Sequence, residues 1–176
     1  MNAERARTDD GSPEKMGSDQ RSEANACSDP VFSLPELFPE ARREPVVIDT
    51  NIVLDVFVFN DAAAKPLRKA LEAGELDWIA TQPMRDELAR VLTYRQIAPR
   101  LAFYRLSADD VLASFDRHAR LLTIAGKARP TCSDIDDQKF IDLAVAGQTL
   151  LLSKDRHILS MSKRLLAHGV RARAAI

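Results

Sequence analysis

The stretch Pro45-Val46-Val47-Ile48-Asp49-Thr50-Asn51 decides the fold class of this chain. It places three apolar residues in a row directly before a carboxylate. A short, unbroken apolar run of this kind is typical of a strand that is buried on both faces in a parallel sheet. The pattern therefore predicts a strand over residues 46–48, with Asp49 at its carboxyl end.

Similar apolar runs recur along the chain, and helical patterns separate them. Residues 76–80 and 149–152 have the composition of buried strands, and residues 170–176 fit an edge strand. Apolar residues at helical spacing predict helices at residues 50–59, 65–73, 84–94, 107–122, 134–146 and 157–167. Strands that alternate with helices indicate an α/β protein with a mainly parallel sheet.

The composition is that of one globular domain with a tail. The chain has 176 residues, of which 45% are hydrophobic and 29% are charged. Residues 1–44 lack hydrophobic periodicity, so we expect a flexible N-terminal tail followed by one domain over residues 45–176. Within the tail, residues 31–38 are apolar enough to dock on the domain or on a partner.

Targeting signals and cysteine chemistry are not evident in the sequence. No apolar run approaches the roughly 18 to 20 residues that span a bilayer, and residues 1–20 are too polar for a secretory signal. We therefore expect a cytoplasmic protein with no membrane partner. Cys27 and Cys132 are too few and too far apart for a disulfide framework or a cysteine zinc site.

Four acids are expected at one edge of the sheet. Asp49 and Asp155 follow buried strands, and Glu87 and Asp137 lie near the starts of helices that follow strands or loops. In a parallel sheet the carboxyl ends of the strands and the starts of the next helices face the same edge, where ligands bind. We therefore expect the four carboxylates to converge on one cleft.

Converging carboxylates favour a metal site. Four such charges repel one another unless a cation lies between them. Hard oxygen ligands favour Mg²⁺ or Mn²⁺ over zinc, and one or two such ions suit the cleavage of a phosphodiester. Ser153 and Cys132 lie in no recognisable triad, and the three histidines lack the spacing of zinc ligands.

Each acid also has a purely structural interpretation. Asp49 and Asp155 suit helix N-caps, and Glu87 suits a surface ion pair with Arg85 or Arg90. Taken together, these interpretations do not explain why the acids recur at the same end of the fold.

The acids around residue 136 leave one choice open. Asp134, Asp136 and Asp137 all suit the start of a helix, where the helix dipole favours negative charge. Helical spacing does not choose between Asp136 and Asp137 as the residue that faces the cleft. Other acids lack this placement and are expected to face solvent, namely Asp55, Asp61, Glu75 and Asp142.

Positive charge gathers in two parts of a chain whose net charge is −1. Residues 85–129 and 154–173 each contain more Arg and Lys than Asp and Glu. The plain interpretation is that these side chains solvate helix faces. Beside a metal site, however, some of them are candidates for contacts with the phosphates of a substrate, namely Arg85, Arg90, Arg95, Lys154 and Arg156.

Four motifs carry the acids: Val46-Val-Ile-Asp-Thr-Asn51, Arg85-Asp-Glu-Leu88, Asp134-Ile-Asp-Asp-Gln-Lys-Phe-Ile141 followed by Asp142-Leu-Ala, and Leu151-Leu-Ser-Lys-Asp155. In this order and spacing they resemble PIN-domain proteins, most closely the bacterial branch described as toxins of toxin–antitoxin pairs. The resemblance extends from about Pro45 to the C-terminus and leaves the N-terminal tail unexplained.

The resemblance implies a fold, an activity and a set of site residues. The fold would be a three-layer α/β/α sandwich around a parallel sheet of about five strands. The activity would be that of an endoribonuclease that cuts single-stranded RNA with Mg²⁺ or Mn²⁺. The catalytic acids and metal ligands would be Asp49, Glu87, Asp137 and Asp155, with Asp137 preferred over Asp136 because it matches the third acid of the family.

Auxiliary residues and partners follow from the same resemblance. Asn51 and Ser153 would orient water or ligands by hydrogen bonding, and Asp136 is a further auxiliary candidate. The family usually has Thr where Ser153 stands, a change that keeps the hydroxyl. The resemblance also implies a homodimer and an antitoxin partner.

A second hypothesis is a catalytically silent PIN-fold protein that acts by binding an antitoxin or another protein. Residues 31–38 would suit folding onto such a partner. A phosphohydrolase is disfavoured because Asn51 stands where that class needs a second acid.

Overall fold

A computed structural model describes residues 43–175 of the protein. The apolar segment 31–38, Cys27 and nearly all of the expected tail therefore lie outside the described residues. Within the described residues, no helix has both the length and the apolar character that crossing a membrane requires.

The described residues form a five-stranded sheet in which every pair of neighbouring strands is parallel. The strand order is β3-β2-β1-β4-β5. The strands are β1 (Glu44–Ile48), β2 (Leu76–Thr81), β3 (Ala119–Leu122), β4 (Leu150–Leu152) and β5 (Arg171–Arg173). The expected α/β class with a parallel sheet of about five strands is confirmed.

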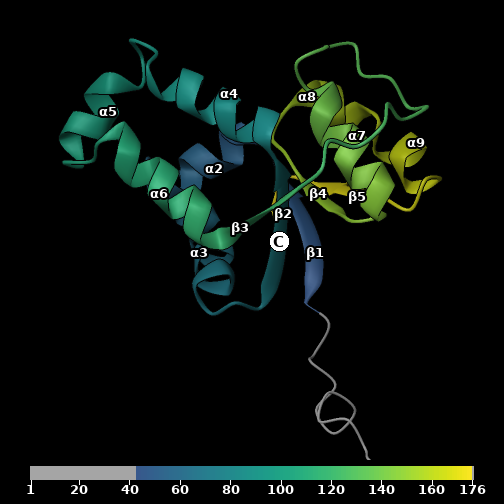
Figure 1. Ribbon diagram of the computed structural model, residues 1–176, viewed down its shortest axis with the longest axis horizontal. Coiled ribbons are helices and arrows are strands. Elements are labelled where there is room, and N and C mark those ends of the chain that lie inside the picture. The colour runs from purple at the N-terminus through teal and green to yellow at the C-terminus, as the bar shows by residue number, and fades with distance from the viewer. Residues whose placement is uncertain (1–42, 176) are drawn as a thin grey trace, which may run out of the picture. The chain divides into compact units, whose positions relative to one another are not determined.

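Helices cover both faces of this sheet (Figure 1). One side carries α2 (Thr50–Phe57), the 3₁₀ turn η1 (Ala62–Ala64), α3 (Lys65–Glu72), α4 (Gln82–Leu92), α5 (Ala98–Phe103) and α6 (Ala108–His118). The other side carries α7 (Gln138–Gly147), α8 (Arg156–Ser160) and α9 (Ser162–Leu166). The arrangement is the three-layer α/β/α sandwich that the motifs implied.

The order in which strands are added to the sheet reverses between β1 and β4. From β1 it winds outward through β2 to β3, and it then crosses to β4 and winds outward to β5. Right-handed crossovers therefore place the helices of the two halves on opposite faces. In sheets of this kind ligands bind outside the carboxyl ends of the strands at the point of reversal.

The two strands at the reversal point are aligned so that their ends are level. Ile48 of β1 pairs with Leu152 of β4, and the amide of Asp49 donates a 2.9 Å hydrogen bond to the carbonyl of Leu152. All three residues of β4 are buried, which is why their sequence is continuously apolar rather than alternating. Asp49 and Ser153 thus emerge side by side from a rigid part of the core.

A cluster of aromatic rings fixes the helices of the first half against β2. The ring of Trp78 in β2 stacks on Phe57 with centroids 6.2 Å apart, and it meets the edge of Phe115 in α6 at 4.8 Å. Offset and edge-on pairs of this kind add about 0.5 to 1.5 kcal/mol each to the gain from burial. This cluster holds α2 and α6 against the sheet.

Several expected elements differ from those in the structure. The helix expected over residues 107–122 ends at His118, because the following four residues pair with the free edge of β2 as strand β3. Helix α5 was not predicted, although Pro99 in its first turn is compatible with a helix start. The final expected helix is divided into α8 and α9 at Met161.

Candidate metal centre

Asp49 is a buried carboxylate at the start of α2. It stands at the N-cap position of this helix with an extended backbone. Only 2% of the residue is exposed. Burial raises the pKa of Asp49, while hydrogen bonds from Ser153 and Asn51 partly oppose that rise. The structural interpretation of Asp49 as a helix cap agrees with its position, but its burial and the bond from Ser153 distinguish it from an ordinary exposed cap.

Ser153 connects the acids that follow the two central strands. Its hydroxyl donates a 2.7 Å hydrogen bond to Oδ2 of Asp49 and accepts one of 2.9 Å from the amide of Asp155. Ser153 is completely buried, so its hydroxyl has a fixed orientation. Ser153 thus fixes one oxygen of Asp49, while its expected role in orienting water or ligands stays a prediction.

Glu87 lies in α4 and faces inward rather than toward the surface arginines. The Thr50 hydroxyl donates a 2.7 Å hydrogen bond to its Oε1, and the Lys139 ammonium forms an ion pair with its Oε2. The side chains of Glu87 and Lys139 are only 14% and 24% exposed, so the pair is shielded from solvent. The alternative of a surface ion pair with Arg85 or Arg90 is therefore wrong.

Asp137 is an acid of this group whose pKa is raised by both burial and the neighbouring acids. It occupies the N-cap position of α7 without making a capping bond, and its Oδ2 is buried with no hydrogen-bond partner. Burial, and then the negative charges of the other acids, Asp49 foremost, raise the pKa of Asp137 to about 7. Asp136, by contrast, is exposed.

Asp155 combines two roles in this geometry. Its Oδ1 accepts a 2.6 Å hydrogen bond from the amide of His157 and so caps α8, as the structural interpretation expected. Its charge also contributes to the raised pKa values of Asp49 and Asp137. Asp155 is therefore both a helix cap and a member of the acidic cluster.

The loop that carries Asp137 is held by buried polar contacts. The side chain of Gln138 accepts a 2.8 Å bond from the amide of Cys132 and donates bonds to the carbonyl of Pro130 and to Asp142. Asp142 also accepts a 2.8 Å bond from the amide of Ala128. The expectation that Asp142 would be solvated is wrong, because it ties this loop to α7.

The donor set of these residues fits a hard divalent cation. Asp49, Glu87, Asp137 and Asp155 offer only carboxylate oxygens, and the unpartnered Oδ2 of Asp137 is a group that a cation would satisfy. Among residues 43–175, however, no group of three His, Cys, Asp or Glu side chains lies close enough together to hold a metal ion. Two of the four carboxylates are engaged elsewhere, Glu87 by Lys139 and Asp155 by α8.

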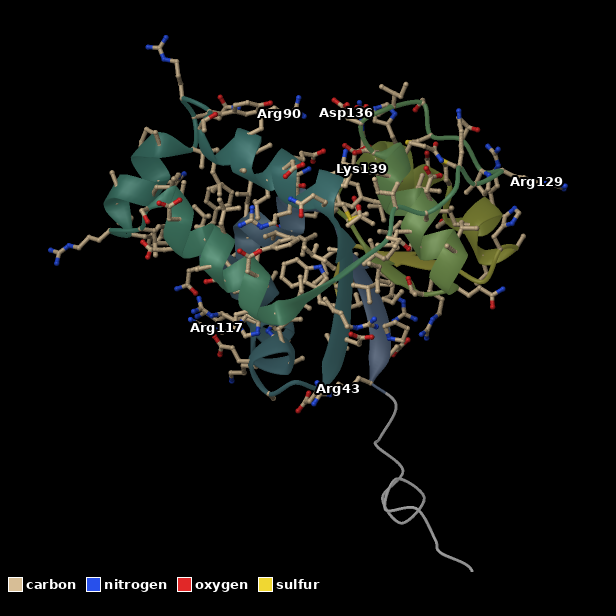
Figure 2. All side chains as sticks on the ribbon, in the orientation of Figure 1. Arg43, Arg90, Arg117, Arg129, Asp136 and Lys139 are labelled. Carbon is tan, nitrogen blue, oxygen red and sulfur yellow. The ribbon has the colours of Figure 1, made fainter. Side chains whose placement is uncertain are left out.

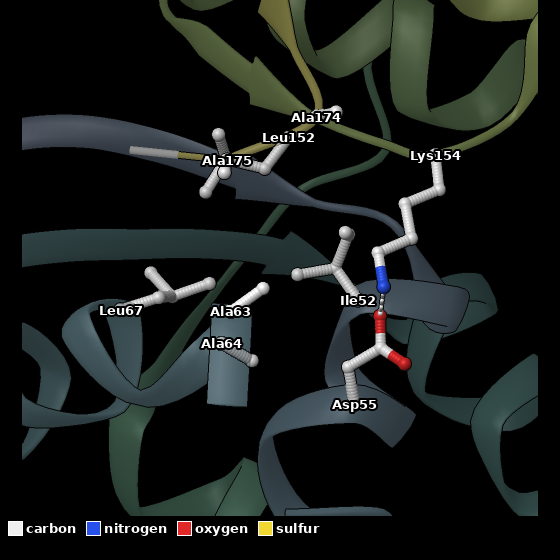
Figure 3. Close-up of a pocket in the computed structure, with 9 residues that line it drawn as sticks. All are labelled: Ile52, Asp55, Ala63, Ala64, Leu67, Leu152, Lys154, Ala174 and Ala175. Atoms are coloured by element: carbon white, nitrogen blue, oxygen red, sulfur yellow. Dashed lines mark ion pairs between the residues drawn. The ribbon is translucent and has the colours of Figure 1, made fainter. Parts of the chain in front are cut away.

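The five candidate phosphate contacts divide into two groups. Arg85 donates two hydrogen bonds to Asp116. Lys154 forms an ion pair with Asp55 (Figure 3) and a longer one with Asp61. Asp55 is thereby buried, in contrast to the solvated position expected for it. Three candidates are exposed and form no ion pair with an acid of the described residues, namely Arg90, Arg95 and Arg156.

Sequence reasoning missed two residues of the centre, Thr50 and Lys139. Lys139 contacts both Glu87 and the carbonyl of Asp136, and so it joins α7 to α4. Both residues lie within the motifs that carry the acids, directly after Asp49 in one case and two residues after Asp137 in the other. Their closeness in sequence to Asp49 and Asp137 is the feature from which they could have been predicted.

The fold and this acidic centre define the class of an α/β nuclease-like domain. A family model described as the PIN domain matches residues 45–157, which is more than half of the chain. The chain therefore belongs to the PIN-domain family, whose members are usually nucleases that act on RNA and generally use divalent metals. No curated protein matches the chain.

Proposed function

We propose that this protein is a metal-dependent endoribonuclease that hydrolyses phosphodiester bonds of single-stranded RNA with Mg²⁺ or Mn²⁺. One observation carries the proposal: the carboxylates of Asp49, Glu87, Asp137 and Asp155 act on one another electrostatically at the reversal point of the sheet. Such an arrangement is costly for a fold unless a cation or a substrate uses it.

The four acids would hold the ion, with Asp49 and Asp137 as its most buried ligands. A bound divalent ion would lower the pKa of a water molecule and offset the charge that develops on the phosphodiester. No side chain of the centre is then needed as a separate nucleophile. Because the pKa of Asp137 is raised to about 7, ion binding would release a proton from this residue near neutral pH.

The neighbouring residues would orient the acids. Ser153 fixes one oxygen of Asp49, and Thr50 fixes one oxygen of Glu87. Asn51 is exposed at the start of α2, where its amide side chain is available to a water or to the substrate. Lys139 differs from these residues, because its ammonium pairs with Glu87 and a bound ion would compete with it for this carboxylate.

A cleavage assay with a matched control tests this proposal. Purified protein is incubated with a fluorescent single-stranded RNA and Mn²⁺ or Mg²⁺, with and without EDTA. We expect cleavage that EDTA and Asp49→Asn abolish and that Asp109→Asn, at an exposed acid of α6, leaves unchanged. Calorimetric titration with Mn²⁺ is the second readout. Full cleavage by Asp49→Asn, or the absence of Mn²⁺ binding by the wild type, would refute the proposal.

We further propose that the enzyme is the toxin of a toxin–antitoxin pair and works as a cytoplasmic homodimer. The support is the resemblance of its four motifs to that branch of the family. Induced expression should then arrest bacterial growth, and Asp49→Asn should relieve the arrest. Equal arrest by both proteins would instead favour the alternative, a catalytically silent PIN-fold protein that acts through a protein partner.

A further inference from the structure

A stretch without acidic residues begins directly after Glu87. Between Glu87 and Asp109 the sequence contains no Asp or Glu, yet it carries four arginines at intervals of five residues: Arg90, Arg95, Arg100 and Arg105. The stretch spans the second half of α4, the following turn and α5. We call residues 90–105 the arginine arm.

The positive charge of the arginine arm is not compensated by neighbouring acids. All four arginines are exposed, and none forms an ion pair with an acid in the part of the chain that the structure describes. Arg100 lies 6.0 Å from the ring centre of Phe59, a contact that leaves its charge in place. Arg85, just before the arm, differs because Asp116 binds its guanidinium at 2.6 and 2.7 Å.

The arm also presents aromatic rings to solvent. Tyr94, Phe103 and Tyr104 are 38%, 75% and 38% exposed, and every other Phe, Tyr or Trp among residues 43–175 is at least partly buried. The ring of Phe103 meets that of Tyr104 edge-on at 4.9 Å, and the Tyr104 hydroxyl donates a 3.2 Å hydrogen bond to the carbonyl of Phe59. Phe103 and Tyr104 are therefore held in place next to the arginines of the arm.

We propose that the arginine arm binds a single strand of nucleic acid, with phosphates on its arginines and unpaired bases stacked on Tyr94 and Phe103. The inference rests on the proposed function and names the surface that would feed RNA to the acids. Flat rings among arginines suit a chain that offers both phosphates and open base faces. In a duplex the base faces are stacked on one another and cannot contact the rings. An acidic protein surface would bind the arginines but would leave the exposed rings without a function.

The arm is continuous with the acidic centre. Arg90 follows Glu87 by three residues, which is about 4.5 Å along the axis of α4 at the usual helical rise. Figure 2 shows Arg90, Asp136 and Lys139 along the same edge of the molecule, and Lys139 contacts both Asp136 and Glu87. A strand that lies on the arm would therefore lead toward the carboxylates.

The first test measures binding of a fluorescent oligouridine RNA to the full-length protein in EDTA, where the proposed cleavage does not interfere. We expect Arg90→Gln/Arg95→Gln to weaken binding about tenfold and to reduce the salt slope by about 1.4, which is about 0.7 for each lost phosphate contact. The matched control is Arg117→Gln, at an exposed arginine that Figure 2 places far from Arg90. That variant should keep the wild-type slope.

The second test separates stacking from charge. We expect Phe103→Ala to weaken binding of the single strand by about fivefold or more and to leave binding of the same sequence in a duplex unchanged. Leu166→Ala removes an exposed apolar side chain from α9 and serves as the control. It should bind both forms like the wild type.

Opposite results would overturn the proposal. Equal loss in Arg90→Gln/Arg95→Gln and Arg117→Gln would mean unspecific attraction, and unchanged single-strand binding by Phe103→Ala would remove the stacking surface. If the arm variants lose binding to an acidic peptide with the sequence of residues 1–42 but keep RNA binding, the arm is a protein-docking surface instead. Arm-dependent RNA binding in EDTA, with neither Mn²⁺ binding nor cleavage once Mn²⁺ is added, would refute the proposed nuclease and leave the arm proposal standing.

Discussion

The hydroxyl of Ser153 donates a 2.7 Å hydrogen bond to Oδ2 of Asp49 although the two residues are 104 positions apart in the sequence. The bond is possible because β1 and β4 are neighbours at the reversal point and their ends are level. It leaves the orientation of the Asp49 carboxylate determined by a fully buried residue. The centre therefore depends on the register of two strands as much as on its acids.

Ser153→Ala should damage the centre through Asp49. It leaves Oδ2 of Asp49 buried without its donor, which should lower the free energy of unfolding by about 1–3 kcal/mol in EDTA. We expect Mn²⁺ affinity to fall about 10- to 100-fold, as is typical when the residue that orients a ligand is removed. Urea denaturation and calorimetry measure the two effects. Wild-type Mn²⁺ affinity in this variant would contradict the positioning role of Ser153.

Lys139→Met should have opposite effects on stability and on metal affinity. Without the ammonium, Oε2 of Glu87 is buried and unpaired, so we expect the metal-free protein to lose about 1–3 kcal/mol of stability. Mn²⁺ affinity should rise, because no internal cation competes for Glu87. The control is Lys154→Met, which breaks the ion pair with Asp55 and should lower stability without raising Mn²⁺ affinity. Weaker Mn²⁺ binding by Lys139→Met would show that the lysine only supports the site.

The stability of the metal-free protein should fall as the pH rises toward neutrality. Folded Asp137 keeps its proton up to a pKa of about 7, whereas its ordinary value is 3.8, so the folded state binds more protons between these values. The stabilisation that protonated Asp137 contributes is therefore complete below about pH 4 and lost by about pH 7. Denaturation in EDTA at pH 5, 6, 7 and 8 measures the slope, which should be smaller in Asp137→Asn. Identical pH profiles of the two proteins would contradict the raised pKa.

Gln138→Ala should loosen the loop that carries Asp137. The change removes three hydrogen bonds, including the bond to the amide of Cys132. Cys132 is 7% exposed, and burial raises the pKa of its thiol, so it should react slowly with a disulfide reagent in the parent protein. We expect faster labelling in Gln138→Ala, measured in a Cys27→Ser background so that only Cys132 reports. An unchanged labelling rate would mean that Gln138 does not hold the loop.

Much of this protein follows from local sequence patterns. The apolar runs before Asp49 and Asp155 were sufficient for the parallel sheet, because a strand buried on both faces has no polar alternation. The expectation that all four acids lie at one edge rested on the rule that parallel strands end on the same side. The strand β3 was missed because Ala119–Leu122 has no distinctive pattern, and only the free edge of β2 makes it a strand.

The sequence by itself determined the α/β class, the positions of the acids along the chain and the acid-free arginine arm. Only the tertiary structure decided which groups face one another. It places Asp137 rather than Asp136 near the other acids, and it pairs Lys139 with Glu87 and Arg85 with Asp116. The physical reason is that periodicity and composition act over a few residues. An ion pair or a pKa shift depends instead on distances between segments that only packing brings together.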